Sequence, residues 1–177
     1  KKAPHLTMLA FERVYRQRPE ARLTMIGGGQ LFEACLQIRE ALGLNEVISM
    51  PGPQSHEGVA AVMGTARAFV QHSVEAPDGD CEGTPVAVLE AGASGLAVIS
   101  TRHAGIADVV EEGQTGLLVD EYDVQGMIDC LLRLTDDPAM AGRLGDAACK
   151  HVSERFSSEQ SIGKLWKILE TAIDQRF

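Results

Sequence analysis

Residues 80–91 read Asp-Cys-Glu-Gly-Thr-Pro-Val-Ala-Val-Leu-Glu-Ala, and they place a helix start between two carboxylates. Thr84 is a favoured N-cap residue, and Pro85 suits the first position of a helix. Glu82 is therefore predicted on the loop before the helix, and Glu90 in its second turn. The backbone N–H groups at a helix start have no partner inside the helix and can bind phosphate. The segment thus offers an anion site flanked by two acceptors for hydroxyl groups.

That combination fits a nucleotide diphosphate-sugar, which presents phosphates, a ribose diol and sugar hydroxyls. Glu90 follows the apolar run 86–89, so we expect its charge to be partly buried and to need partners. The simple alternative for Glu82 and Glu90 is a pair of solvated side chains near a helix. The apolar surroundings of Glu90 favour a binding role for the pair.

Outward from this segment, short apolar runs alternate with amphipathic stretches along the chain. Such runs are typical of parallel strands covered on both faces, so the alternation predicts an α/β protein with a Rossmann-like, doubly wound parallel sheet. Ser55, Asp137 and the pair Ser157 and Gln160 are predicted to begin helices, and Gly95 to end one. The predicted strands are 22–26, 47–50, 68–71, 97–100 and 116–119. The predicted helices are 4–17, 30–42, 55–65, 85–94, 105–111, 123–134, 138–153 and 158–174.

In an open parallel sheet, ligands bind outside the carboxyl ends of the strands. The glycines 27–29 follow the first strand and either approach a phosphate or base closely or make a tight turn. They do not form a dinucleotide fingerprint, because Phe32 stands where the third glycine belongs. After later strands, His103 is a candidate substrate contact, and His72 is a structural group or a donor to a ligand. The loops predicted at this edge are 27–30, 51–56, 72–84 and 101–106.

Size and composition exclude several classes of protein. The 177 residues suffice for one domain, and a net charge of −9 without a Lys/Arg cluster argues against nucleic-acid binding. Four scattered cysteines without a C-x-x-C pair indicate reduced thiols in a cytoplasmic protein and no zinc site. Asp78 and Asp80 lack a third ligand nearby, so no metal is expected. No apolar run reaches the roughly 20 residues that span a bilayer. The opening Lys-Lys-Ala-Pro, without Met, reads as part of a longer protein.

Together these segments resemble the C-terminal, donor-binding half of retaining GT-B glycosyltransferases, the large family called glycosyltransferase group one, or family four. The resemblance covers essentially the whole chain. Two residues depart from the family pattern: Ala3 replaces a glycine after Lys2, and Asp108 replaces a glutamate. The matching motifs are 22–29, 51–52, 68–73, 82–85, 90–95, 99–106 and 115–119.

The resemblance implies a role for each matched residue. Glu82 would contact hydroxyls of the transferred sugar, and Lys2 would neutralise the diphosphate, so these two would serve catalysis. Glu90 would hold the ribose diol. The other residues expected to bind the donor are Gly83, Thr84, Pro85 and Val86 beside the diphosphate, Gly28, Gly29, Gly52 and Pro53 near the nucleotide, and His103.

The resemblance also implies that residues 1–177 form a nucleotide-sugar (donor) binding domain, one half of a GT-B fold. The N-terminal acceptor domain and the strand before Lys2 would lie outside the chain. The expected reaction transfers a sugar to an acceptor hydroxyl of a glycan or lipid-linked saccharide, with retention and without metal or cofactor. It would serve polysaccharide biosynthesis in the cytoplasm. The fragment alone is expected to be inactive, with peripheral membrane contact in the full-length parent. A non-catalytic nucleotide-sugar-binding module and a GT-B-fold sugar-nucleotide epimerase stay open as alternatives.

Overall fold

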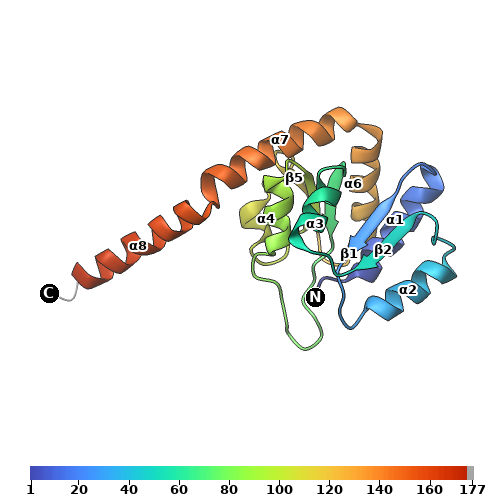
Figure 1. Cartoon of the computed structure of the whole chain (residues 1–177), viewed down its shortest axis with the longest axis horizontal. Helices are drawn as coiled ribbons and strands as arrows, with labels where there is room; N and C mark the ends of the chain where they lie inside the picture. The colour runs from blue at the N-terminus through green and yellow to red at the C-terminus, as the bar shows by residue number, and fades with distance from the viewer. Residues whose placement is uncertain (175–177) are drawn as a thin grey trace.

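The computed structural model describes residues 1–174, and Figure 1 shows strands and helices alternating along them. Each predicted element is present, with its ends within two residues of the prediction. The strands are β1 (Leu23–Ile26), β2 (Ile48–Gly52), β3 (Ala68–Gln71), β4 (Ala97–Thr101) and β5 (Gly116–Val119). The helices are α1 (Pro4–Gln17), α2 (Phe32–Ala41), α3 (His56–Met63), α4 (Val86–Ala93), α5 (Ile106–Val109), α6 (Val124–Asp136), α7 (Pro138–Arg155) and α8 (Ser158–Asp174).

All strand pairs are parallel, as predicted, but in the part of the chain that the structure describes they form two separate sheets. β1 pairs with β2, and β4 lies between β3 and β5. The backbone N–H of Val74, just after β3, donates to the carbonyl of Lys1 at 2.8 Å. The first residue therefore lies beside the chain that leaves β3. Parallel pairing brings the carboxyl ends of neighbouring strands to one edge of each sheet, where the loops of interest begin.

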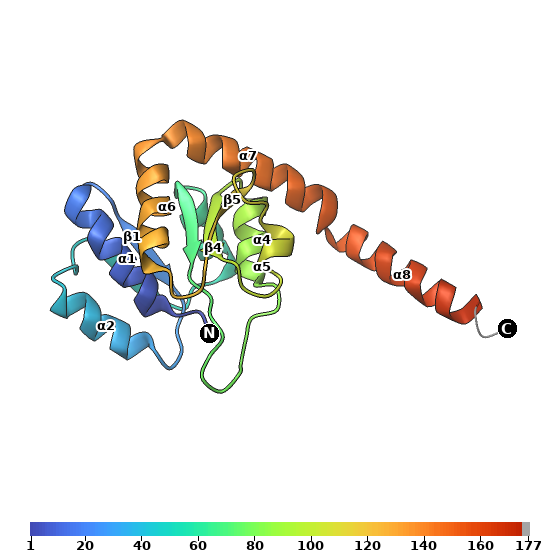
Figure 2. The same ribbon diagram turned by 180° about the vertical axis from the view of Figure 1, so that it is seen from behind.

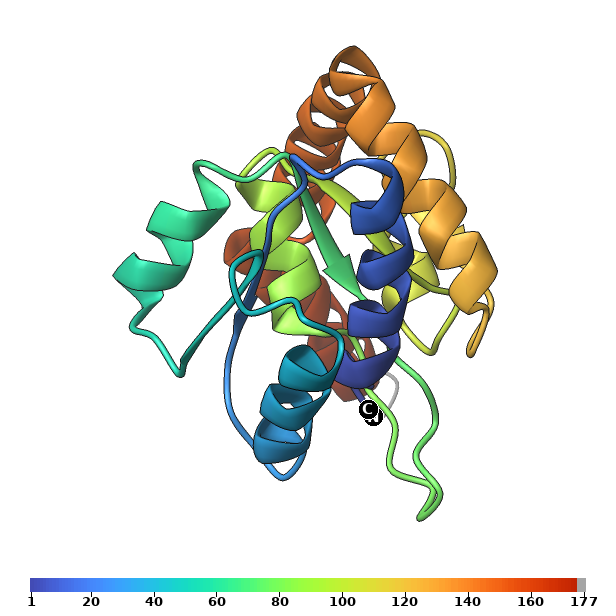
Figure 3. The ribbon, with the colours of Figure 1, turned by 90° about the vertical axis from the view of Figure 1, so that its right-hand side faces the viewer.

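Helices cover both faces of the three-stranded sheet, which is what a doubly wound fold requires. Ile99 of β4 and Leu117 of β5 pack against α1 and α6, whereas Val98 and Leu118 pack against α4 and α5. Figure 3 shows a strand between α4 on one side and α1 and α6 on the other. Burial on both faces explains the uninterrupted apolar runs in the sequence. A third cluster around Met8 covers the β1–β2 sheet.

Helix caps agree with the sequence at most positions. The side chains of Ser55 and Asp137 accept the backbone N–H groups of the residues three positions on, at 3.2 and 2.8 Å. Ser157 likewise accepts from the N–H of Gln160 at 3.2 Å. Gly95 has a φ of 75° directly after α4 and its C-cap Ser94.

The predicted start of α4 was wrong by one residue. Pro85, in an extended conformation, is the N-cap, Val86 begins the helix, and no side chain caps it. Thr84 does not cap the helix because the loop before α4 packs on the turn after β4. There the backbone N–H of Gly105 donates to the carbonyl of Gly83 at 2.9 Å.

Helix α8 points away from the rest of the molecule (Figures 1 and 2). It carries apolar side chains that are largely exposed and recur at helical spacing. No helix among residues 1–174 is long and apolar enough to cross a membrane. The exposed apolar residues of α8 include Ile162, Leu165, Trp166, Leu169 and Ile173.

Candidate functional site

Glu82 lies on the loop between β3 and α4 and is only 9% exposed. Its backbone N–H donates to Nε2 of His103 at 3.1 Å, which fixes the main chain at this point. Its Oε1 atom is buried and accepts no hydrogen bond from the residues that the structure describes. The ammonium group of Lys2 stands 3.7 Å from this oxygen. Oε1 of Glu82 is therefore ion-paired with Lys2 and still has the capacity to accept a hydrogen bond from a hydroxyl donor.

Lys2 reaches this position through an unusual backbone. Ala3, the N-cap of α1, has φ 31° and ψ 54°, which is left-handed. Glycine adopts this conformation with little strain, and this is the position at which the family resemblance implies glycine. Lys1 also faces the β3–α4 loop, since its Nζ lies 3.0 Å from Oδ1 of Asp80. Two cations at the start of the chain therefore face two acids of the loop.

The start of α4 is open to solvent beside Glu82. Gly83 and Thr84 are exposed and Pro85 is buried, and the side chain of Val86 is 65% exposed. A Cβ added to Gly105 would stand 2.3 Å from Oγ1 of Thr84. The carbonyl oxygen of Gly83 would be 3.1 Å from the same Cβ, so glycine allows the turn after β4 to pack closely on the residues before α4. The N–H of Val88 donates to the carbonyl of Pro85 at 3.0 Å, whereas those of Val86 and Ala87 have no acceptor inside the helix, so this end suits an anion.

Glu90 lies within α4 and is half-buried, as its apolar neighbours predicted. No hydrogen bond or ion pair of its side chain occurs within the described residues 1–174. Its carboxylate is therefore available to a ligand, as the sequence suggested for a residue that needs partners.

The glycine loops after β1 and β2 meet each other. The N–H of Gly27 donates to the carbonyl of Gly52 at 3.1 Å, and a Cβ on Gly28 would stand 3.3 Å from Cγ of Pro53. Gly29 and Gly52 have φ values of 126° and 75°. These residues form a second group, which no hydrogen bond recorded for residues 1–174 joins to the Glu82 loop. Both groups lie toward the edge that carries the N-terminus (Figure 1).

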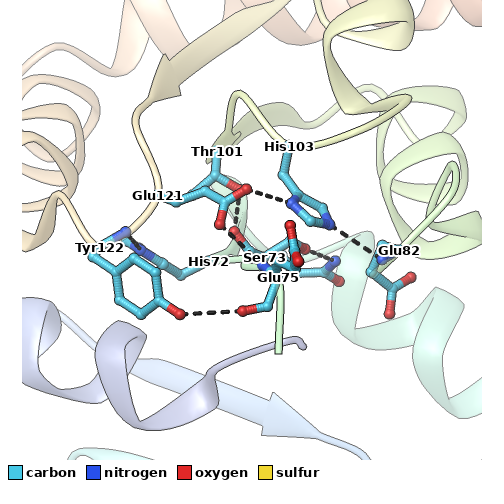
Figure 4. Close-up of polar contacts among 9 residues, drawn as sticks. His72, Ser73, Glu75, Glu82, Thr101, His103, Glu121 and Tyr122 are labelled. Atoms are coloured by element: carbon cyan, nitrogen blue, oxygen red, sulfur yellow. Dashed lines mark hydrogen bonds and ion pairs between the residues drawn. The ribbon is translucent and has the colours of Figure 1, made fainter. Parts of the chain in front are cut away.

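Figure 4 shows a polar network beside Glu82 that the sequence did not predict. Oε1 of Glu121 accepts from Nδ1 of His103 at 2.6 Å, and its Oε2 accepts from the backbone N–H of Glu75 at 2.9 Å. The hydrogen bond from His103, and then that from Glu75, hold the pKa of the Glu121 carboxyl below its usual range. Glu121 follows β5, a strand whose carboxyl-end loop is not among the predicted ones. The rule that ligands gather at strand ends would have included it.

His72 belongs to the same network and has a structural role. It is fully buried, and its Nε2 accepts from the backbone N–H of Tyr122 at 3.0 Å. Burial lowers the pKa of His72, which favours the neutral ring that this acceptor role requires. Its Nδ1 has no hydrogen-bond partner among the described residues.

Other parts of the molecule add little to this site. No group of three or more His, Cys, Asp or Glu side chains suited to a metal occurs among residues 1–174. A cavity of about 530 Å³ lies along β1 and β2, lined by Arg22 and Arg39 among others, and contains none of the predicted site residues.

Comparison with known proteins decides the family. Residues 1–151 match the family model described as glycosyl transferases group 1. The chain belongs to this family. Among its group 1 relatives, the amylovoran biosynthesis glycosyltransferase AmsK of Erwinia amylovora is 36% identical over 148 residues, 83% of this chain and 36% of AmsK. The chain therefore spans about a third of the length of the curated relatives it matches.

Solved structures show that this group 1 chain has the predicted fold. HepE of Anabaena in complex with UDP superposes with a TM-score of 0.84 at 18% identity, over 96% of this chain and 45% of HepE. The C-terminal domain of the group 1 protein LpcC from Francisella tularensis gives a TM-score of 0.77 at 19% identity, over 89% of this chain and 80% of that domain. Both the Rossmann-like half of a GT-B fold and the family resemblance are thereby confirmed.

Proposed function

We propose that this chain is the donor-binding domain of a glycosyltransferase that moves a sugar from a nucleotide diphosphate-sugar to an acceptor hydroxyl. The observation that carries the proposal is the buried, unsatisfied Oε1 of Glu82, with the Lys2 ammonium 3.7 Å away and the open start of α4 beside it. The UDP bound to HepE, a structure of the same fold, supports a nucleotide ligand. The match to a C-terminal domain, that of LpcC, supports the assignment to the second half of a longer protein.

In the proposed reaction, negative charge develops on the departing diphosphate. The Lys2 ammonium and the first N–H groups of α4 would stabilise that charge in advance, in place of a metal. Glu82 would orient the sugar by accepting its hydroxyl groups, and proximity to the acceptor would supply much of the remaining acceleration. We further propose retention of configuration with assistance from the leaving group, as the family resemblance implies.

The whole parent protein would supply what this chain lacks. Acceptor contacts would come from an N-terminal domain, so the fragment alone is proposed to be inactive. The name of AmsK supports a role in polysaccharide biosynthesis, which we propose takes place on the cytoplasmic side of a membrane that the parent contacts peripherally.

Substitution of Glu90 tests the nucleotide site. We expect Glu90→Ala to weaken nucleotide binding by about 1–3 kcal/mol, because hydrogen bonds to the ribose are lost. Titration calorimetry of the chain with UDP, GDP and ADP measures this change and identifies the preferred base. Glu154→Ala on α7, which removes an exposed glutamate from a different helix, is the matched control. Equal affinities for wild type and Glu90→Ala would remove Glu90 from the site, and binding of none of the three would contradict the donor-binding role.

Transfer can also be separated from the open alternatives with the full-length parent. Incubation with UDP-glucose alone distinguishes an epimerase, since epimerisation needs no acceptor. Turnover only in the presence of a saccharide acceptor supports a transferase, and binding without turnover under both conditions supports a non-catalytic module.

A further inference from the structure

The carboxylate of Glu121 accepts two N–H donors, one from the β3–α4 loop and one from His103, which itself accepts an N–H from the other end of that loop (Figure 4). Glu75, near the start of the β3–α4 loop, donates its backbone N–H directly at 2.9 Å. Glu82, near the end of that loop, donates its backbone N–H to His103 at 3.1 Å, and His103 donates to Glu121 at 2.6 Å. One side chain after β5 therefore holds both ends of the segment that carries Glu82.

The chemistry of this chain of bonds fixes each proton. The N–H of Glu82 is a donor, so Nε2 of His103 must be without a proton, and the neutral ring carries its proton on Nδ1. The acceptor for Nδ1–H must in turn accept a second N–H, from Glu75. An ionised carboxylate offers only acceptors and satisfies both donors, whereas an amide would present its NH₂ group to one of them. The position therefore requires an acid.

Tyr122, which follows Glu121, also links the turn after β5 to the start of the β3–α4 loop. Tyr122 donates its backbone N–H to His72 at 3.0 Å and its hydroxyl to the carbonyl of Glu75 at 3.2 Å. Its φ of 63° is rare for a residue with a side chain and is held by these contacts. The turn that carries Glu121 is thus itself fixed against the start of the loop.

We propose that Glu121 is a positioning residue that holds Glu82 in place to recognise the sugar of the donor. The inference rests on the proposed function, in which Glu82 contacts the sugar while Glu90 and the start of α4 hold the nucleotide. Loss of the Glu121 carboxylate should therefore weaken binding of a nucleotide-sugar but leave binding of its nucleoside diphosphate almost unchanged. A residue that merely stabilises the fold would not change this ratio.

The decisive experiment compares Glu121→Ala and Glu121→Gln with wild type. The matched control is Asp120→Asn, which alters the neighbouring, exposed acid. The sugar nucleotide is whichever of UDP-glucose, GDP-mannose and ADP-glucose the wild type binds most tightly. Calorimetry measures the affinity of each variant for this sugar nucleotide and for the corresponding nucleoside diphosphate. We expect Glu121→Ala to bind the sugar nucleotide about tenfold more weakly and the diphosphate within about twofold, the tenfold change being that of one charge-assisted hydrogen bond. The affinity of Glu121→Gln for the sugar nucleotide should lie between those of wild type and Glu121→Ala, since the amide oxygen accepts one N–H donor where the carboxylate accepts two.

Hydrogen exchange of the unliganded chain provides a readout that needs no nucleotide. The amides of Glu75 and Glu82 should exchange faster in Glu121→Ala than in wild type and Asp120→Asn, while that of Ile99 in the core stays unchanged. Unchanged exchange at Glu75 and Glu82, or equal weakening of both ligands, would overturn the proposal. The proposal would also be overturned if the wild type bound the nucleotide-sugar no more tightly than the corresponding diphosphate. Failure of the wild type to bind any of these compounds would instead contradict the proposed function, while the exchange data would still decide whether Glu121 holds the loop.

Discussion

Ala3 joins Lys2 to α1 through left-handed backbone, which sets the direction in which the chain enters the helix after Lys2. In the left-handed region, steric crowding between the alanine Cβ and the backbone costs about 1–2 kcal/mol. Replacement by glycine removes this crowding. It also increases the conformational entropy of the unfolded chain, which lowers the free energy of unfolding by about 0.4–1 kcal/mol. The methyl group of Ala3 is also buried, and its loss costs about 0.8 kcal/mol. We therefore expect Ala3→Gly to change the free energy of unfolding in urea by less than about 1 kcal/mol, because relief of the crowding offsets both losses.

Ala139 on the exposed surface of α7 provides the matched control for this substitution. There the same change should destabilise by about 0.5–1 kcal/mol, because the helical conformation offers glycine no relief. Without strain at residue 3, the buried position should lose more stability than the exposed one. Destabilisation by Ala3→Gly clearly greater than that of Ala139→Gly would therefore show that residue 3 is not strained in solution.

Of the predicted site residues, the structure pairs Glu82 with Lys2, whereas the glycine loops after β1 and β2 form a separate group. Glu82 and Lys2 were singled out by the carboxylate motif and the family resemblance, and they lie 3.7 Å apart. Glu121 was not predicted, because its partners Glu75 and His103 are distant in sequence. Such a contact depends on the packing of three loops, which no short motif records.

At the scale of the elements, the packing of α7 on the sheet depends on a glycine. A Cβ added to Gly145 would stand 2.0 Å from the carbonyl oxygen of Gly95, which is main chain and cannot rotate away. We expect Gly145→Ala to destabilise the chain by about 1–3 kcal/mol through overpacking. Gly142, one turn earlier on the same helix, has nothing within 4 Å of an added Cβ. Gly142→Ala should stabilise by about 0.5–1 kcal/mol, since alanine is the better helix former. Urea denaturation of both variants checks the prediction, and equal effects at the two positions would contradict the packing of α7.

The elements themselves were predictable because apolar period and cap residues act locally. The four-residue run of β5 (Gly116–Val119) and the caps at Ser55 and Asp137 were all predicted correctly. The pairing of the strands was less predictable. A single sheet was expected, whereas the hydrogen bonds between strands form two sheets.

At the scale of the whole molecule, α8 is the element least attached to the rest (Figure 2). It contains the single tryptophan of the chain, Trp166, whose side chain is 61% exposed and whose Nε1 donates to Glu170 one turn on at 2.7 Å. Tryptophan fluorescence, excited where the two tyrosines do not absorb, therefore reports on this helix alone. We expect emission typical of indole in water and strong quenching by acrylamide in the folded chain at micromolar concentration. The double variant Leu144→Trp/Trp166→Phe, whose only indole lies in the core between α7 and the sheet, is the contrasting control and should emit at shorter wavelength. Shielded, blue-shifted emission from Trp166, independent of protein concentration, would show that α8 folds back onto its own chain. The same shielding appearing only as concentration rises would show that the apolar face of α8, 46–66% exposed at Ile162, Leu165, Trp166, Leu169 and Ile173, associates between copies.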